Sequence, residues 1–364
     1  MKIISQETIK PSSPTPSHLK THVISLIDNN IPHSPVPFIF FYNNYEDGDI
    51  NNLKKSLSLC LTQYYPFAGR FLVPNAGQID CNDEGVAFLE VAHETRLDDF
   101  ILENENDESI RQLLPDFDKN RSSLIHVQLN HFTGGGVALV VSISHKAARG
   151  GSPFKPRFYT SPTSHNDVVE LFEPKSTNEE TTHEVVKFVL KSFVFPNSKL
   201  NDLKKEVLRS MGMGVRNPDL TRVEVLTSLL FKCAIDAATT RSGTDDSQEI
   251  ALHEVVDKLR KRKMECKYER NVQEIGEKHA RLMPMPAKEH VYWSTSFCWF
   301  PIYEVDFGWG KPVQFKYVVE EVHVKNFVLV DTPERDGIEA TVRLPEEEMM
   351  IFQQDKRLLA YVGA

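Results

Sequence analysis

The chain has 364 residues, of which 40% are hydrophobic and 26% are charged, and this composition excludes a disordered or fibrous protein. Its 51 acidic and 42 basic side chains leave a net charge of −9, and the acids are scattered along the chain, which argues against a nucleic-acid-binding face. One hydrophobic core rarely serves a chain of this length, so two domains are expected.

The first half contains several predicted elements. Three prolines force residues 9–18 into an extended path, and short strands are predicted at 22–26 and 37–42. Asp49 is a candidate N-cap for a helix that ends before Pro66. The residues expected on the buried face of this helix are Leu53, Leu57, Cys60, Leu61 and Tyr64.

Two neighbouring strands follow further along. Residues 124–132 alternate between apolar and polar side chains, which predicts a strand. A glycine-rich turn at 133–136 leads into the near-continuous apolar run 137–144, which is typical of a strand buried on both faces. This run delivers His145 at the end of the strand, where a side chain can enter a cleft.

The second half is more helical. Residues 150–182 are rich in Pro, Ser, Thr and Asn and predict a linker. A strand is expected at 185–195, helices at 221–240, 250–263 and 346–359, and strands within 313–330. The basic run 258–263 is interpreted as the solvated face of its helix. The predicted class is therefore α/β.

The five cysteines are widely spaced and form no C-x-x-C pair, so neither a disulfide framework nor a zinc site is expected. Residues 1–10 lack the apolar core of a secretory signal, and no apolar run is long enough to span a bilayer. These features predict a cytoplasmic protein with no membrane partner and no bound metal.

Two motifs point to a chemistry. The segment Ser144-His145-Lys146-Ala147-Ala148-Arg149-Gly150 and the segment Asp306-Phe307-Gly308-Trp309-Gly310 together resemble the paired motifs of the plant BAHD acyl-CoA-dependent acyltransferases. Further blocks in the same order extend the resemblance over nearly the whole chain, and it is closest to the alkaloid-acetylating, vinorine-synthase-like branch. These blocks are 11–16, 65–70, 80–86, 221–226 and 303–312.

The resemblance implies two chloramphenicol-acetyltransferase-like domains with mixed, largely antiparallel sheets and a tunnel between them. The expected domains are 1–155, which carries His145, and 185–364, which carries the Asp306–Gly310 motif, joined by a linker at 156–184. The family uses acyl-CoA as a co-substrate, holds no bound cofactor and acylates a small-molecule acceptor, and its members are generally monomers.

The resemblance also implies roles for single residues. His145 is the expected general base, because an imidazole can take a proton from an alcohol near neutral pH. Asp306, Gly308, Trp309 and Gly310 are expected to be structural. Thr295 and Ser296 are candidates for supporting the oxyanion or the substrate, because the family often has a tryptophan at the next position and this chain has Phe297.

The chain departs from the family pattern at the first motif. Family members have an aspartate where this chain has Arg149, and that aspartate pairs with an arginine of the second domain. The segment that carries this arginine is not recognisable between the helices predicted at 221–240 and 250–263, and the region after Gly150 is also short. Loss of both partners leaves neither charge unpaired.

Two hypotheses follow. The chain is an acyltransferase that moves an acyl group, with acetyl expected, to a hydroxyl of a plant specialised metabolite such as an alkaloid, with His145 as base. Alternatively, it is a catalytically impaired or inactive relative, the product of a shortened gene. The absence of a G-x-S-x-G elbow and of a P-loop leaves serine hydrolases and nucleoside-triphosphate enzymes without support.

Overall fold

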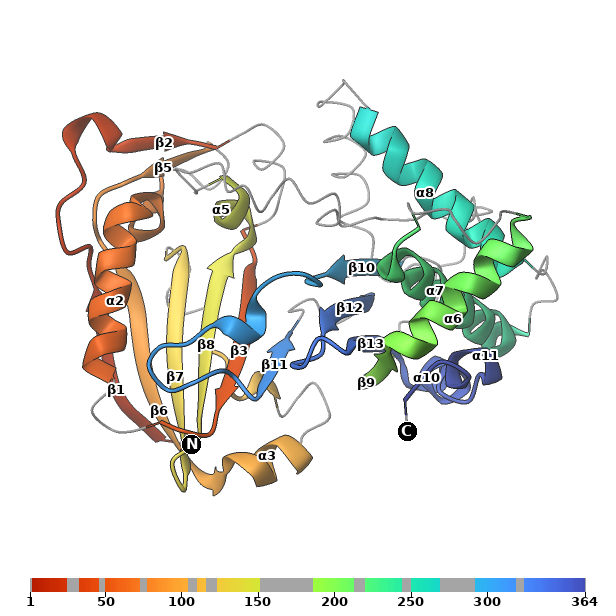
Figure 1. Cartoon of the computed structure of the whole chain (residues 1–364). Helices are drawn as coiled ribbons and strands as arrows, with labels where there is room; N and C mark the ends of the chain where they lie inside the picture. The colour runs from red at the N-terminus through yellow and green to blue at the C-terminus, as the bar shows by residue number, and fades with distance from the viewer. Residues whose placement is uncertain are drawn as a thin grey trace. The chain divides into compact units, whose positions relative to one another are not determined.

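The computed structural model describes residues 2–24, 33–45, 50–72, 77–103, 110–115, 123–150, 186–212, 220–243, 250–268, 292–318 and 324–363. As the length predicts, the chain forms two compact units, each with its own sheet (Figure 1). The first unit consists of Met1–Thr160, Asn271–Met283 and Pro301–Glu320, and the second consists of Ser161–Arg270, Pro284–Phe300 and Glu321–Ala364. The chain therefore returns to the first unit after it has entered the second.

The first unit is built on a six-stranded sheet with the order β1-β6-β7-β8-β3-β11. Only the β6–β7 pair is parallel, and the other four pairs are antiparallel. The strands are β1 (Lys2–Ile9), β3 (Pro35–Tyr42), β6 (Val86–Arg96), β7 (Ile125–Thr133), β8 (Val137–Ser144) and β11 (Gln314–Tyr317). A small second sheet has the order β2-β5-β4, with β2 (Thr21–Val23), β4 (Arg70–Phe71) and β5 (Gln78–Asp80).

Helices complete the first unit. They are α2 (Ile50–Gln63), α3 (Leu97–Glu103) and α5 (His145–Gly150). The predicted α2 is confirmed, and Leu53 and Leu61 pack into the core on one face of the large sheet. Cys60, predicted on the same face, is exposed, because it lies at the edge of the apolar stripe. The Asp49 cap lies outside the described residues.

Strands β7 and β8 form the centre of the large sheet. The prediction for β8 is confirmed at both ends, and most of its residues are buried. The strand predicted at 124–132 is confirmed as β7, and its alternating polar residues are buried as well. His126, Gln128 and Asn130 are at most 3% exposed. The side-chain amides of Gln128 and Asn130 are satisfied by hydrogen bonds to the Leu113 carbonyl at 2.9 and 3.1 Å, so their burial leaves no amide unpaired there.

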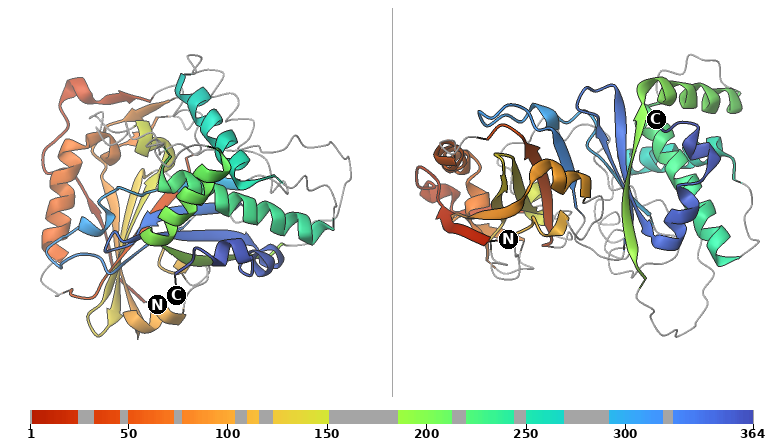
Figure 2. Two further views of the ribbon diagram at one scale, coloured as in Figure 1. Left: turned by 45° about the vertical axis from the view of Figure 1, so that its right-hand side comes forward. Right: turned by 90° about the horizontal axis from the view of Figure 1, so that it is seen from below.

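The second unit is a four-stranded sheet with helices packed on one of its faces (Figure 2). The strand order is β10-β12-β13-β9, with β9 (Phe188–Pro196), β10 (Tyr292–Ser296), β12 (Lys325–Asp331) and β13 (Gly337–Pro345). The helices are α6 (Asn197–Ser210), α7 (Arg222–Ser242), α8 (Leu252–Tyr268), α10 (Glu346–Phe352) and α11 (Lys356–Leu359). The helices predicted at 221–240 and 250–263 are thus confirmed as α7 and α8.

Two expectations differ from the structure. The single helix predicted at 346–359 is two helices, because the Asp355 carboxylate caps a new start by accepting the Arg357 N–H at 2.8 Å. The Asp306–Gly310 motif was expected in the C-terminal domain, but it belongs to the first unit, because the segment that follows it pairs as β11 with β3. The predicted linker 156–184 lies outside the described residues.

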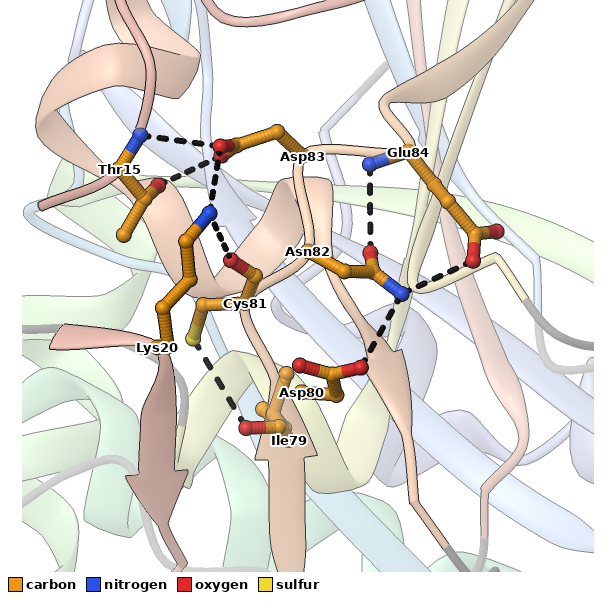
Figure 3. A network of polar contacts seen from close by, with 8 residues as sticks. All are labelled: Thr15, Lys20, Ile79, Asp80, Cys81, Asn82, Asp83 and Glu84. Atoms are coloured by element: carbon orange, nitrogen blue, oxygen red, sulfur yellow. Dashed lines mark hydrogen bonds and ion pairs between the residues drawn. The ribbon is translucent and has the colours of Figure 1, made fainter. Parts of the chain in front are cut away.

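The carboxylate of Asp83 ties the N-terminal segment to the turn between β5 and β6 (Figure 3). It accepts the Thr15 N–H at 2.9 Å and also the Thr15 hydroxyl, and it pairs with the Lys20 ammonium at 3.0 Å. Asp83 has a φ of 59°, a left-handed conformation that Asp and Asn tolerate better than most residues. Burial alone would raise the pKa of Asp83, but the Thr15 and Lys20 contacts hold it below its ordinary value.

Replacement of Asp83 by Asn, which tolerates the same backbone, should lower the free energy of unfolding by about 1–3 kcal/mol at pH 7. Because the folded-state pKa is depressed, this contribution exists above the unfolded-state pKa and is lost as the pH falls through the folded-state pKa. Urea unfolding of wild type and Asp83→Asn at several pH values measures it. A stability difference that persists unchanged at the acid end would contradict the assignment.

Candidate functional site

His145 is the first residue of α5 and follows directly after β8 (Figure 1). Its side chain is half-buried. Two backbone hydrogen bonds hold the junction between strand and helix. The Ser144 N–H donates to the Leu124 carbonyl at 2.8 Å, and the His145 N–H donates to the Ser34 carbonyl at 2.8 Å. The chain direction at His145 is therefore set by contacts on both sides of β8.

The hydroxyl of Ser144 makes a second set of contacts at this junction. Ser144 is fully buried, and its Oγ accepts the Ala147 N–H at 3.3 Å, as an N-cap does. The same oxygen lies 2.7 Å from Nδ1 of His33. The His33 ring packs edge-on against Phe71, with ring centroids 4.9 Å apart. A buried polar cluster thus surrounds the first turn of α5.

Lys146, next to His145, is buried as well. It is 3% exposed, and its Nζ lies 5.5 Å from the centroid of the Phe71 ring. Burial lowers the pKa of Lys146. The aromatic face offers a favourable position for the ammonium group. Phe71 therefore contacts both Lys146 and His33. Lys146 follows His145 in the chain, and His33 reaches Ser144, the residue before His145.

Arg149 occupies the position at which the family pattern has an aspartate. The backbone of α5 is helical through Gly150, so positions 145 and 149 are one helical turn apart. The side chain of Arg149 lies outside the described residues.

Thr295 and Ser296 belong to β10 of the second unit. Successive residues of a strand point to opposite faces, so these two side chains cannot line the same surface. Tyr292 reaches α7, where its hydroxyl donates to the Ala234 carbonyl at 3.1 Å. Ser296 lies on the same face of β10 as Tyr292. It is 7% exposed, and its hydroxyl accepts the Cys298 N–H at 3.3 Å. Thr295 lies on the opposite face and is partly buried.

The Asp306 carboxylate organises a tight turn. Its Oδ1 accepts the N–H groups of Gly308 at 2.7 Å and Gly310 at 3.0 Å. Gly308 and Gly310 have φ values of 101° and 84°, which non-glycine residues rarely adopt. The same Asp306 charge, together with burial as the larger cause, raises the pKa of Tyr42. The carboxylate is thus engaged by the backbone of its own turn.

Trp309 is carried into the core by this turn. It is 3% exposed and packs edge-on against Tyr42 and Tyr45, with ring centroids 5.3 and 5.1 Å away. The Tyr42 hydroxyl donates to the Val305 carbonyl at 3.0 Å. These aromatic contacts attach the motif to β3 within the first unit.

A metal site and a membrane-spanning helix are two further features that the described residues can be checked against. Among the residues that the structure describes, no group of three or more His, Cys, Asp and Glu side chains could hold a metal ion. No helix in this part of the chain is both long and apolar enough to cross a membrane.

Comparison with known proteins decides the family. The profile of the Transferase family matches residues 1–155, 152–266 and 243–359, which together cover nearly the whole chain. This chain belongs to that family, the BAHD acyltransferases. The BAHD family uses acyl-CoA as co-substrate, and its members transfer acyl groups.

Individual relatives are similar to this chain over nearly their full lengths. Akuammiline synthase 1 of Alstonia scholaris is 33% identical, over 99% of this chain and 97% of the relative. Deacetylvindoline O-acetyltransferase of Catharanthus roseus is 31% identical, over 99% and 97%. The crystal structure of vinorine synthase is similar with a TM-score of 0.72 at 25% identity, and covers 99% of this chain and 98% of that one. The expected BAHD fold is confirmed.

The alignment with a relative is also longer than this chain. The alignment with akuammiline synthase 1 spans 419 positions, which is 55 more than the 364 residues of this chain. The family profile matches in three pieces that meet at 152–155 and 243–266. These are the two regions in which the sequence lacked recognisable BAHD segments.

Two residues at the candidate site were not recognised from the sequence. Ser144 was noted only as part of the motif, and His33 was not singled out. The order Ser-His at the end of an apolar strand could have predicted Ser144 as the N-cap. His33 had no local signal, because it reaches Ser144 only through the pairing of β3 with β8.

Replacement of Trp309 by alanine should destabilise the first unit by about 3–5 kcal/mol, because it removes a large buried ring from an aromatic cluster. Trp309→Phe, which keeps an aromatic ring, should cost less. Denaturant unfolding followed by far-UV circular dichroism measures both. If Trp309→Ala left the unfolding curve unchanged, the motif would not have the structural role that its packing indicates.

Proposed function

We propose that this chain transfers an acyl group, with acetyl as the donor group, from acyl-CoA to a hydroxyl of a plant specialised metabolite. His145 is the general base. The observation that carries the proposal is the placement of His145, which is half-buried at the end of a central strand, with its own N–H bound by the Ser34 carbonyl and the N–H of the preceding Ser144 bound by the Leu124 carbonyl. Membership in the BAHD family supplies the reaction class.

The chemistry assigned to His145 is proton transfer in both directions. Its imidazole takes the proton of the acceptor hydroxyl while the hydroxyl oxygen attacks the thioester carbonyl. The tetrahedral intermediate then breaks its carbon–sulfur bond, and the departing thiolate takes the proton back from the imidazolium. The products are the ester and free CoA, and His145 is regenerated.

We propose that Thr295 or Ser296 supports the oxyanion or the substrate. Ser296 shares the helix-facing side of β10 with Tyr292, and its hydroxyl accepts a hydrogen bond from its own loop. Thr295 lies on the other side of the strand, and a hydroxyl there can donate to a developing negative charge. Asp306, Gly308, Trp309 and Gly310 are assigned to the structure of the turn, in agreement with their contacts.

The acceptor class is proposed from the relatives. One relative is named deacetylvindoline O-acetyltransferase and another stemmadenine O-acetyltransferase, both of Catharanthus roseus. An alcohol of alkaloid type and an acetyl donor are therefore the first substrates to test. We further propose that the protein acts in the cytoplasm, since its four described cysteines are free thiols, and that it is a monomer, as members of the family generally are.

A second candidate is a relative of the family with impaired turnover. Arg149 at the aspartate position favours it, and so does the lack of recognisable family segments after Gly150 and between the helices at 222–242 and 252–268. Position 149 lies one helical turn after His145 on the backbone of α5, and like charges four positions apart on a helix disfavour each other, so Arg149 disfavours the imidazolium that forms during proton transfer.

The general-base role predicts that His145→Ala lowers kcat by about 10²–10⁴. The measurement is CoA thiol release from acetyl-CoA with a panel of alkaloid alcohols, and the fold is checked by circular dichroism. His18→Ala is the matched control, because His18 is exposed and lies in the short segment 17–19, away from the motif. Full activity of His145→Ala would overturn the mechanism.

Arg149→Asp separates the two candidates. Reversal of the charge at this i, i+4 position should stabilise the imidazolium by about 0.4–1 kcal/mol, which corresponds to about a 2- to 5-fold increase in kcat. Arg149→Ala should give an intermediate value. Absence of turnover in the wild type and in both variants would favour the impaired relative.

A further inference from the structure

We infer that His33 and Ser144 form a clamp that positions His145, so that the base depends on a residue more than a hundred positions earlier in the chain. The His33–Ser144 clamp is defined by the hydrogen bond between Nδ1 of His33 and Oγ of Ser144 at 2.7 Å. The inference rests on the proposed role of His145. Neither His33 nor Ser144 is assigned to contact substrate, and both act through the first turn of α5.

The backbone brings the clamp together. Strand β3 pairs with β8 from Tyr42↔Val137 to Pro35↔Ser144. The two residues before β3 therefore pass beside the start of α5. One of them, Ser34, accepts the His145 N–H through its carbonyl at 2.8 Å, and the other, His33, reaches the Ser144 hydroxyl. One short segment thus contacts both residues of the strand–helix junction.

The side chains of Ser144 and His33 form a directional hydrogen bond at this junction. Ser144 Oγ accepts the Ala147 N–H at 3.3 Å, so its hydroxyl hydrogen can be donated to Nδ1 of His33. Ser144 is fully buried, which makes an unmade hydrogen bond there expensive. Phe71 holds the His33 ring from the side, at 4.9 Å between centroids. The clamp therefore has a support of its own in β4.

The consequence concerns the imidazole of His145. A helix whose first turn is capped and tied has one preferred orientation, and His145 is the first residue of that turn. Proton transfer needs the base within hydrogen-bond reach of the hydroxyl, and a misplacement of about 1 Å can cost about a hundredfold in rate. Loss of the clamp should therefore lower the chemical step more than substrate binding.

Three variants test the clamp in the full-length protein. Ser144→Ala removes the shared oxygen, and His33→Leu removes the ring nitrogen. His33→Asn is the conservative variant, because its side-chain amide can place a polar atom close to the position of Nδ1. Thr221→Ala is the matched control, since it removes an N-cap of the same kind, at 3.1 Å from the Glu224 N–H, from α7 in the second unit.

Two readouts are measured for each variant, alongside the thermal midpoint. The first is kcat and KM with acetyl-CoA and an accepted alcohol. The second is the Cε1–H proton resonance of His145, assigned by its loss in His145→Ala, which reports the environment of the ring without any turnover.

The clamp predicts that Ser144→Ala and His33→Leu lower kcat by about 10- to 100-fold with KM changed less than about twofold. It also predicts that both move or broaden the His145 resonance, that His33→Asn retains most of kcat and a near-wild-type resonance, and that Thr221→Ala loses only thermal stability. If kcat in Ser144→Ala and His33→Leu stayed within twofold of wild type, the clamp would be overturned. An unchanged His145 resonance in both variants would overturn it even if the wild type showed no turnover, an outcome that would separately count against the proposed function.

Discussion

The candidate site depends on the pairing of one strand with two neighbours. Strand β8 is hydrogen-bonded to β3 along its whole length and to β7 over seven residues, from Val137↔His131 to Ile143↔Ile125. Both of its faces are largely buried, so a slip by one residue would exchange the two core faces. Because the register cannot slip, the end of β8 is fixed, and with it the position of His145.

Strand β3, one of the two neighbours of β8, also contacts the Asp306–Gly310 motif. On its other edge, β3 pairs with β11, and Tyr42 at the end of β3 packs against Trp309. Thus β3 pairs with β8, the strand that ends directly before His145, on one side and contacts the segment that contains Asp306–Gly310 through Tyr42 on the other. Two motifs whose residues His145 and Asp306 are 161 positions apart in the sequence are brought to one sheet by a single strand. This arrangement gives a physical reason for the packing of the Asp306–Gly310 turn against the large sheet.

The sequence predicted those parts of the fold that carry a local signal. The apolar run of β8, the glycine-rich turn before it and the amphipathic pattern of α7 were recognised close to their observed bounds. Strand β1 was missed, because it is an edge strand with almost all of its side chains exposed. The unit that contains Asp306 was predicted incorrectly, because strand pairing between β11 and β3 is non-local and leaves no pattern in either segment.

The site was predictable to a similar degree. The motif identified His145, and the end of an apolar run placed it correctly at a strand terminus. His33 and the opposite facing of Thr295 and Ser296 required the structure, since both depend on strand register. The burial of Lys146 was also unpredicted, because a lysine in a polar hexapeptide is expected to be exposed.

The most direct test of the account is a crystal structure of the protein with CoA bound. The account predicts the CoA sulfur close to the His145 imidazole, with room for an acceptor hydroxyl at about 2.6–3.2 Å from a ring nitrogen. CoA bound with its sulfur away from His145, or a His145 ring enclosed by side chains that leave no approach for a thioester, would contradict it.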